Sequence, residues 1–159
     1  MNISNEDVIQ QWLSADKNLD KDTVELATYF VRFGSLISDA RNNFCKNYGI
    51  NVSEFDVLAT LFRSGTSYEL TAKELKERTL LPSSGALSNR IDRLDSKGLV
   101  TRRHDLVDKR SVKISLTNDG VELMVKAAPE FFNEMGKLFN GLSDTQVAQL
   151  KSSLTQLLP

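Results

Sequence analysis

The stretch from Leu80 to Leu116 constrains the fold of this chain most, because a helical pattern changes there into a strand pattern within a few residues. Leu87, Ile91 and Leu94 recur at i, i+4 and i+7, which stacks them on one face of an α-helix. Small and polar side chains fall on the opposite face. This helix is therefore predicted to be buried on one side and open to solvent on the other.

The residues after this helix alternate with a period of two, which is typical of β-strands. Leu99–Arg103 is expected to form one strand, and a polar, basic loop from His104 to Arg110 follows it. On the return strand Val112, Ile114 and Leu116 alternate with polar residues, which predicts one buried face. The expected fold class is mainly α with a small β-hairpin, a winged helix-turn-helix. In this fold a helix enters the major groove of DNA and the hairpin reaches towards the minor groove.

These segments carry a family resemblance. SSGALSNRIDRLDSKGLVTRR and DLVDKRSVKISLTNDG resemble the recognition helix and wing of MarR-type transcription regulators, and the likeness extends upstream through EFDVLATLFRSGTSYELTAKEL. They are similar in particular to the urate-responsive branch, which has an extra N-terminal helix bearing a Trp comparable to Trp12. The resemblance implies a homodimeric repressor that a small anionic ligand, urate or a related aromatic anion, releases from a palindromic double-stranded DNA operator.

The expected DNA contacts lie on the outer face of the helix and in the wing. Short hydrogen-bonding side chains beside Gly85 permit a close approach to base edges and phosphates. Asp108 and Arg110 match the Asp-x-Arg of the family's wing, which implies an arginine in the minor groove that an ion pair orients. The predicted DNA-binding set is Ser83, Ser84, Gly85, Ser88, Asn89, Arg93, Asp108, Lys109 and Arg110.

Four residues match, one by one, the Trp, Asp and two Arg that the urate-responsive branch uses for its ligand: Trp12, Asp56, Arg90 and Arg102. Arg90 lies about 60° from Leu87 on a helical wheel, on the flank of the buried face. Its guanidinium is expected to point inwards, where it needs a carboxylate or an anionic ligand.

Each of these residues also has a purely structural explanation. Trp12 can pack a helix in place, Arg102 can touch a phosphate, and Ser53-Glu-Phe-Asp56 has the spacing of a capping box. The two explanations remain open at this point.

Amphipathic helices are expected on both sides of the DNA-reading middle. Residues 1–50 are predicted to form N-terminal helices at the edge of the ligand pocket and in the dimer, residues 51–116 the winged helix-turn-helix, and residues 117–159 C-terminal dimerisation helices. The apolar stripe of the second helix is longer than a small winged helix covers, which predicts a partner chain: Leu26, Phe30, Phe33, Ile37 and Phe44.

The charge distribution agrees with DNA binding although the formal net charge is −1. From Arg63 to Lys113 there are 12 Lys and Arg against 7 Asp and Glu, a net charge of +5, whereas the rest of the chain has 8 against 14, a net charge of −6. Phosphate neutralisation needs a basic surface only where the DNA lies. The basic middle therefore marks the expected interface.

Other functions are weaker interpretations. The only histidine, His104, lies in the wing, and neither an activated nucleophile nor a metal-ligand spacing is present, so an enzyme and a cofactor are not expected. A redox-sensing regulator acting through Cys45 is one alternative, although a small buried hydrophobe is the ordinary role there. A winged-helix protein-interaction module without DNA binding is another. Asn89, Arg93 and Arg110 argue against it, because they keep hydrogen-bonding groups where the fold would present them to DNA. Neither a membrane-length apolar run nor a signal peptide is found, which predicts a cytoplasmic protein without membrane contact.

Overall fold

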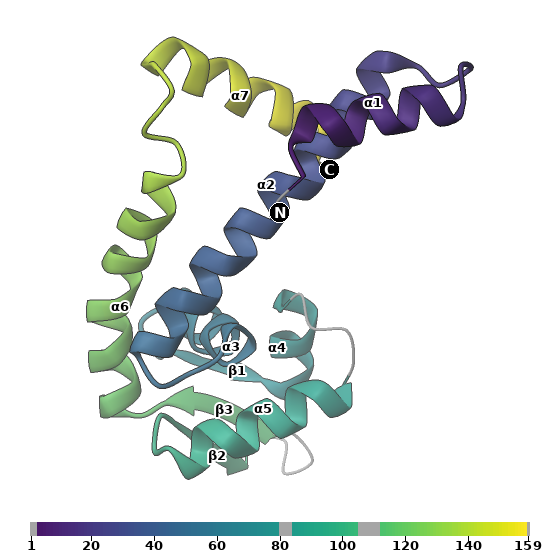
Figure 1. Cartoon of the computed structure of the whole chain (residues 1–159). Helices are drawn as coiled ribbons and strands as arrows, with labels where there is room; N and C mark the ends of the chain where they lie inside the picture. Colours follow the sequence, from purple (N-terminus) through teal and green to yellow (C-terminus); the bar gives the residue numbers. More distant parts are fainter. Residues whose placement is uncertain (1–2, 80–83, 105–111, 159) are drawn as a thin grey trace. The chain divides into compact units, whose positions relative to one another are not determined.

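The computed structural model describes residues 3–79, 84–104 and 112–158. Contacts divide the chain into two compact units, Met1–Ala40 and Arg41–Pro159, each of which is described by itself. The division of the chain into three functional segments stays a prediction. In chain order the described elements are α1 Asn5–Ala15, α2 Lys21–Asn47, α3 Val52–Phe62, β1 Glu69–Thr71, α4 Ala72–Arg78, α5 Ser84–Ser96, β2 Val100–His104, β3 Val112–Leu116, α6 Asn118–Lys137 and α7 Asp144–Leu157 (Figure 1).

The smaller unit contains α1 and the first part of α2. At the start of α1 the Ser4 hydroxyl accepts a hydrogen bond from the Asp7 N–H at 3.0 Å, and the Asp7 carboxylate accepts one from the Ser4 N–H at 3.2 Å. This capping box, which has the Ser-x-x-Asp spacing typical of a helix start, satisfies two N–H groups that would otherwise be unpaired. Asp20 caps α2 in a similar way, because its carboxylate accepts from the Thr23 N–H at 2.8 Å.

The larger unit is built around α3, in which Val57, Leu58 and Leu61 are fully buried. Burial of each such leucine contributes about 1.5–3 kcal/mol. Phe55 of α3 also joins two other helices: its ring centroid lies 5.8 Å from that of Phe44 in α2 and 4.7 Å from that of Phe131 in α6. These are favourable spacings for aromatic pairs. Together they hold α3 in the centre of the core.

The sheet has three antiparallel strands in the order β1-β3-β2, with Leu70 and Arg102 as the neighbours of Ile114 on its two sides. The sequence predicted only the β2–β3 hairpin, so the prediction of a two-stranded hairpin is incomplete. Because β3 is the central strand, Ser115 is buried as well as its neighbours Ile114 and Leu116. The α3, α4 and α5 helices pack around this sheet (Figure 1).

The start of α3 differs from the prediction. The capping box is made by Asn51 and Glu54: the Asn51 side chain accepts from the Glu54 N–H at 2.9 Å, and the Glu54 carboxylate accepts from the Asn51 N–H at 3.0 Å. The predicted box of Ser53 and Asp56 is therefore wrong, since the helix begins two residues earlier.

Large apolar side chains remain exposed in both units. On α2, Leu26 and Phe30 of the predicted stripe are about half exposed, whereas Phe44 is buried in the core. The α7 helix has no buried residue. The other strongly exposed apolar side chains include Tyr29, Val31, Leu36, Val125, Phe132, Leu157 and Leu158.

Within the described part of the chain no helix is long and apolar enough to cross a membrane.

Candidate DNA interface and ligand site

The α4 and α5 helices form the helix-turn-helix expected from the sequence. The α4 helix begins with a capping box, in which Thr71 Oγ1 accepts from the Glu74 N–H at 3.2 Å and the Glu74 carboxylate accepts from the Thr71 N–H at 2.9 Å. On α5, Leu87, Ile91 and Leu94 are buried, each with 4% or less of its surface exposed. The predicted apolar face of α5 is therefore confirmed.

The outer face of α5 presents small and polar residues. Gly85, Ser88 and Asn89 are exposed, and outside the helix itself no heavy atom lies within 4 Å of the point where a Cβ at Gly85 would stand. Ser84 is the first residue of α5, and Ser83 lies outside the described residues. Such a face allows backbone and short polar groups to come close to the floor of a groove.

Arg93, which the sequence assigned to the DNA-binding set, lies on the flank of α5 and has a protein partner. Its Nε is 3.0 Å from Oε1 of Glu54, while 56% of the Arg93 side chain is exposed. One turn later, Lys97 donates to Oε2 of Glu54 at 2.8 Å and to the carbonyl oxygen of Gly49 at 2.9 Å. The side of α5 that adjoins the outer face is thus attached to the start of α3.

Glu54 is the residue of this region that the sequence reasoning missed. Burial raises the pKa of its carboxyl group. Hydrogen bonds from Lys97 and from the Asn51 N–H, together with the charges of Lys97 and Arg93, lower the pKa by more than burial raises it. The resulting pKa is below the ordinary value, so the buried group is an anion at neutral pH. The only signal in the sequence is the Asn-x-x-Glu spacing of a helix start.

The base of the wing is attached to α5. Arg102 of β2 forms an ion pair with Asp92 of α5 at 2.6 Å, and its guanidinium also lies 3.5 Å from the carbonyl oxygen of Ser88. These contacts link β2 to the middle of α5. The predicted wing contacts lie outside the described residues: Asp108, Lys109 and Arg110.

Asp56 lines a cavity of about 620 Å³ in the larger unit. Its carboxylate accepts a hydrogen bond from Arg41 of α2 at 2.5 Å. Arg63 and Arg78 also line the cavity, so three guanidinium groups accompany one carboxylate and the local charge is positive. Most of the other lining residues are apolar: Phe55, Ala59, Phe62, Met124, Ala128, Phe131 and Phe132. An apolar cavity with a few charged groups is typical of a site for a small molecule.

Arg90 lies on the flank of the buried face, as predicted. Its Nε donates to Ser53 Oγ at 2.6 Å, and its NH1 donates to the side-chain oxygen of Asn89 at 3.3 Å. Ser53 stands one turn before Asp56 on α3, so Arg90 is held beside the helix that carries Asp56. Asp56 itself is paired with Arg41, and the structure shows no direct pairing between Arg90 and Asp56 among the contacts that it describes.

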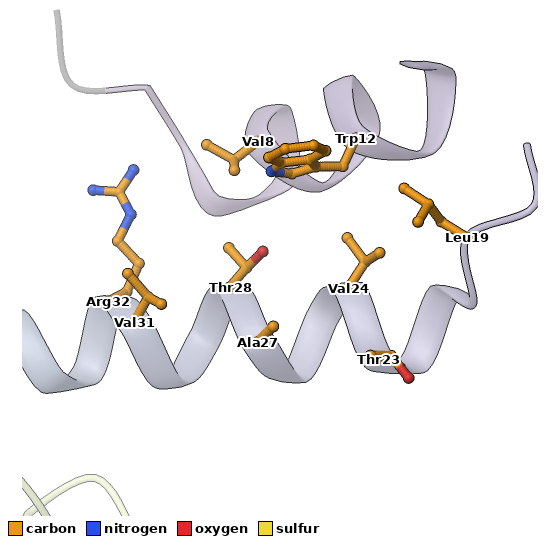
Figure 2. Close-up of a pocket in the computed structure, with 9 residues that line it drawn as sticks. All are labelled: Val8, Trp12, Leu19, Thr23, Val24, Ala27, Thr28, Val31 and Arg32. Carbon is orange, nitrogen blue, oxygen red and sulfur yellow. The ribbon is translucent and has the colours of Figure 1, made fainter. Parts of the chain in front are cut away.

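Trp12 belongs to the smaller unit, where its indole ring extends from α1 towards α2 (Figure 2). It lines a cavity of about 390 Å³, and 58% of its surface is exposed. The other residues around this cavity are mainly apolar, with Arg32 at one end (Figure 2). The grouping of Trp12 with Asp56, Arg90 and Arg102 stays a prediction.

Known proteins identify the family to which this arrangement belongs. A MarR family model matches residues 48–111. The transcriptional repressor MprA of Escherichia coli (strain K12) is 32% identical over 125 residues, which cover 78% of this chain and 69% of MprA. The chain belongs to the MarR family.

Two further comparisons cover more of the chain. The HTH-type transcriptional regulator PecS of Dickeya dadantii (strain 3937) is 28% identical over 148 residues, 93% of this chain and 89% of PecS. The solved structure of a mutant MarR from E. coli complexed with operator DNA matches with a TM-score of 0.74 and 26% identity, over 89% of this chain and 99% of that chain. The predicted fold class, a winged helix-turn-helix that is mainly helical, is confirmed.

In this MarR-family chain the thiol of Cys45 is almost completely buried, with 1% of the residue exposed. Burial raises the pKa of the Cys45 thiol to about 11. A thiol with this pKa holds very little of the reactive thiolate at neutral pH. The finding favours the role of a small buried hydrophobe over that of a redox sensor.

Proposed function

We propose that this MarR-family protein is a homodimeric repressor that binds a palindromic operator through α5. The observation that carries the proposal is the outer face of α5, where Gly85, Ser88 and Asn89 are exposed opposite an apolar stripe in the core. A helix with one thin polar face is suited to the major groove. The similarity to MarR complexed with operator DNA supports the same use of the helix.

The wing supplies the second contact in this proposal. Arg110 enters the minor groove and Asp108 orients it, as the Asp-x-Arg motif of the family implies, and Lys109 adds a positive charge beside the phosphates. The ion pair of Arg102 and Asp92 supports a coupled placement, because it joins the base of β2 to α5 at 2.6 Å. The helix and the wing then bind as one surface.

The exposed apolar helices support the homodimer. Leu26 and Phe30 on α2, and Leu157 and Leu158 at the end of α7, are each about half exposed or more in the single chain. Within each helix these are neighbouring apolar side chains, and exposed apolar patches mark contacts with another chain. A two-fold dimer presents two α5 helices to half-sites about one duplex turn, roughly 34 Å, apart.

A gel-shift experiment on the DNA upstream of the protein's own gene tests the proposal. We expect a discrete complex with two chains per operator, and binding about 10³-fold tighter than to a scrambled duplex at the same salt concentration. The number of chains is measured by light scattering of the complex. Equal affinity for the operator and the scrambled duplex would contradict the proposal and favour a protein-interaction module.

A small planar anion, urate or a related aromatic anion, is proposed to weaken operator binding. The cavity beside Asp56 supports this, because Arg41, Arg63 and Arg78 make it positive and phenylalanine rings form its walls. Flat anions fit such a combination of ring faces and guanidinium groups.

Arg90 and Arg102 are not among the residues that line the cavity beside Asp56. We propose that they transmit the effect of the ligand to the elements that touch DNA. These side chains are bound to Ser53 and Asp92 in the present structure, at 2.6 Å each. An anion that attracts both guanidinium groups competes with these partners and favours a different placement of α5 and the wing. The anion therefore binds the present and the altered arrangement of α5 and the wing with different affinities. A ligand must do so to shift the equilibrium between two arrangements. Trp12 is proposed as a further ligand residue because it matches the tryptophan of the urate-responsive branch.

Arg90→Ala is expected to abolish the response to ligand while the protein remains folded. In the wild type, millimolar urate should weaken operator binding in fluorescence anisotropy and quench Trp12, the only tryptophan of the chain. Lys126→Ala, which removes an exposed cation from α6, serves as the control and should respond like the wild type. A wild type without either response argues against urate, and a normal response in Arg90→Ala argues against the site.

A further inference from the structure

The carboxylate of Glu54 is completely buried and both of its oxygens lie beside cations of α5. Oε2 accepts hydrogen bonds from Lys97 at 2.8 Å and from the Asn51 N–H at 3.0 Å. Oε1 lies 3.0 Å from Nε of Arg93, but it accepts no hydrogen bond of good geometry. An interior carboxylate is tolerated only when it is well paired, so these contacts define where α5 can lie.

The cations are spaced so that they follow one side of the helix. Arg90, Arg93 and Lys97 stand at i, i+3 and i+7, which brings them to the same flank at three successive turns. All three contact the start of α3 or the turn before it: Arg90 binds Ser53, Arg93 and Lys97 bind Glu54, and Lys97 also binds the Gly49 carbonyl oxygen. Apolar packing is not directional. These polar contacts, in contrast, fix the rotation of α5 and its position along its axis.

The two partners of Glu54 are held in different ways. Lys97 makes two hydrogen bonds and 33% of its side chain is exposed. Arg93 makes one ion pair through Nε, without the geometry of a hydrogen bond, and 56% of its side chain is exposed on the flank next to Asn89. A guanidinium carries five N–H donors, so an arginine held by Nε can still offer its terminal nitrogens to a phosphate.

We propose that Glu54 is the positioning residue of the recognition helix, with Lys97 as its fixed anchor, and that Arg93 is shared between Glu54 and a phosphate of the DNA backbone. The inference rests on the proposed operator binding. Glu54 itself touches no DNA. It acts by presenting the outer face of α5 at one rotation, so that the base-reading side chains meet their bases.

Glu54→Gln tests the positioning role, because it removes the charge and keeps the size of the side chain. We expect the ratio of operator affinity to scrambled-duplex affinity to fall about tenfold or more, the equivalent of one lost base contact. Glu74→Gln is the matched control. Glu74 holds the same position in the capping box of α4, but its side chain is 43% exposed and its ion pair is with Arg78 of its own helix. The ratio should change less than about twofold in this control, since no base contact is lost.

Two further variants separate the roles of the cations and serve if Glu54→Gln does not fold. Lys97→Met should lower the affinity ratio without changing the salt dependence of binding, whereas Arg93→Gln should reduce the slope of log K against log[salt] by about 1, the loss of one phosphate contact. The affinities are measured by anisotropy at a temperature where circular dichroism shows each variant fully folded.

The outcomes distinguish this inference from the proposed function. If the wild type has no preference for its operator, both fail. If the wild type has that preference and Glu54→Gln or Lys97→Met is less stable but keeps the affinity ratio, Glu54 is only structural and this inference alone is overturned. An unchanged salt slope in Arg93→Gln overturns the phosphate contact.

Discussion

Gly120→Ala is expected to lower the free energy of unfolding by about 3 kcal/mol, the upper part of the range for overpacking a core with one methyl group. A Cβ at Gly120 would lie 2.1 Å from the carbonyl oxygen of Leu99 and 3.1 Å from its carbonyl carbon. These are backbone atoms, and the same oxygen accepts a hydrogen bond from the Thr117 N–H at 3.1 Å. Rotation of a side chain cannot relieve the clash, so the start of α6 must move away from the α5–β2 connection.

The same substitution later in α6 provides the control. Gly136 has no heavy atom within 4 Å of its Cβ position outside the helix backbone, so Gly136→Ala should leave stability unchanged or raise it by roughly 0.5 kcal/mol through helix propensity. Urea denaturation followed by circular dichroism measures both variants. Two variants of equal stability would show that the contact between Gly120 and Leu99 is not close.

Features that depend on neighbouring residues could be predicted from the sequence. The buried stripe of α5 is confirmed, and the capping boxes of α1, α4 and α7 follow spacings that are visible in the sequence, because helical period and cap spacing are local properties. The start of α3 was predicted wrongly because two overlapping spacings, Asn51 to Glu54 and Ser53 to Asp56, satisfy the same local rule. Only packing decides which of the two is used.

Features that depend on distant pairing could not be predicted. The three residues of β1 are too few to show alternation, and their partner β3 lies more than 40 residues later in the chain. Glu54 was missed because a glutamate is expected on the surface, and its burial needs the two cations of α5. Asp56 is likewise paired with Arg41, 15 residues earlier, across two helices. Tertiary contacts therefore decide the charged part of the candidate site.

Asn89→Ala is expected to weaken operator binding by about 1–3 kcal/mol, which is about 5- to 150-fold, if the proposed use of α5 is correct. Asn89 is exposed on the outer face of the helix, and the Arg90 guanidinium donates to its side-chain oxygen at 3.3 Å. That hydrogen bond orients the amide, whose oxygen keeps a second lone pair and whose nitrogen keeps two donors. An amide in this position can bind an adenine edge through two hydrogen bonds, as asparagine side chains do in the major groove.

The loss in Asn89→Ala should be specific in two ways. Affinity for a scrambled duplex and the salt dependence of binding should stay the same, because no phosphate contact is removed. Discrimination should relax at one base pair in each half-site, which competition with singly substituted operators measures. Asn140→Ala, the same change in an exposed turn between α6 and α7, is the control and should bind like the wild type. If Asn89→Ala remains folded and binds the operator with unchanged affinity, Asn89 does not belong to the base-reading face, and the contact must come from Ser88 or from the residues that begin α5.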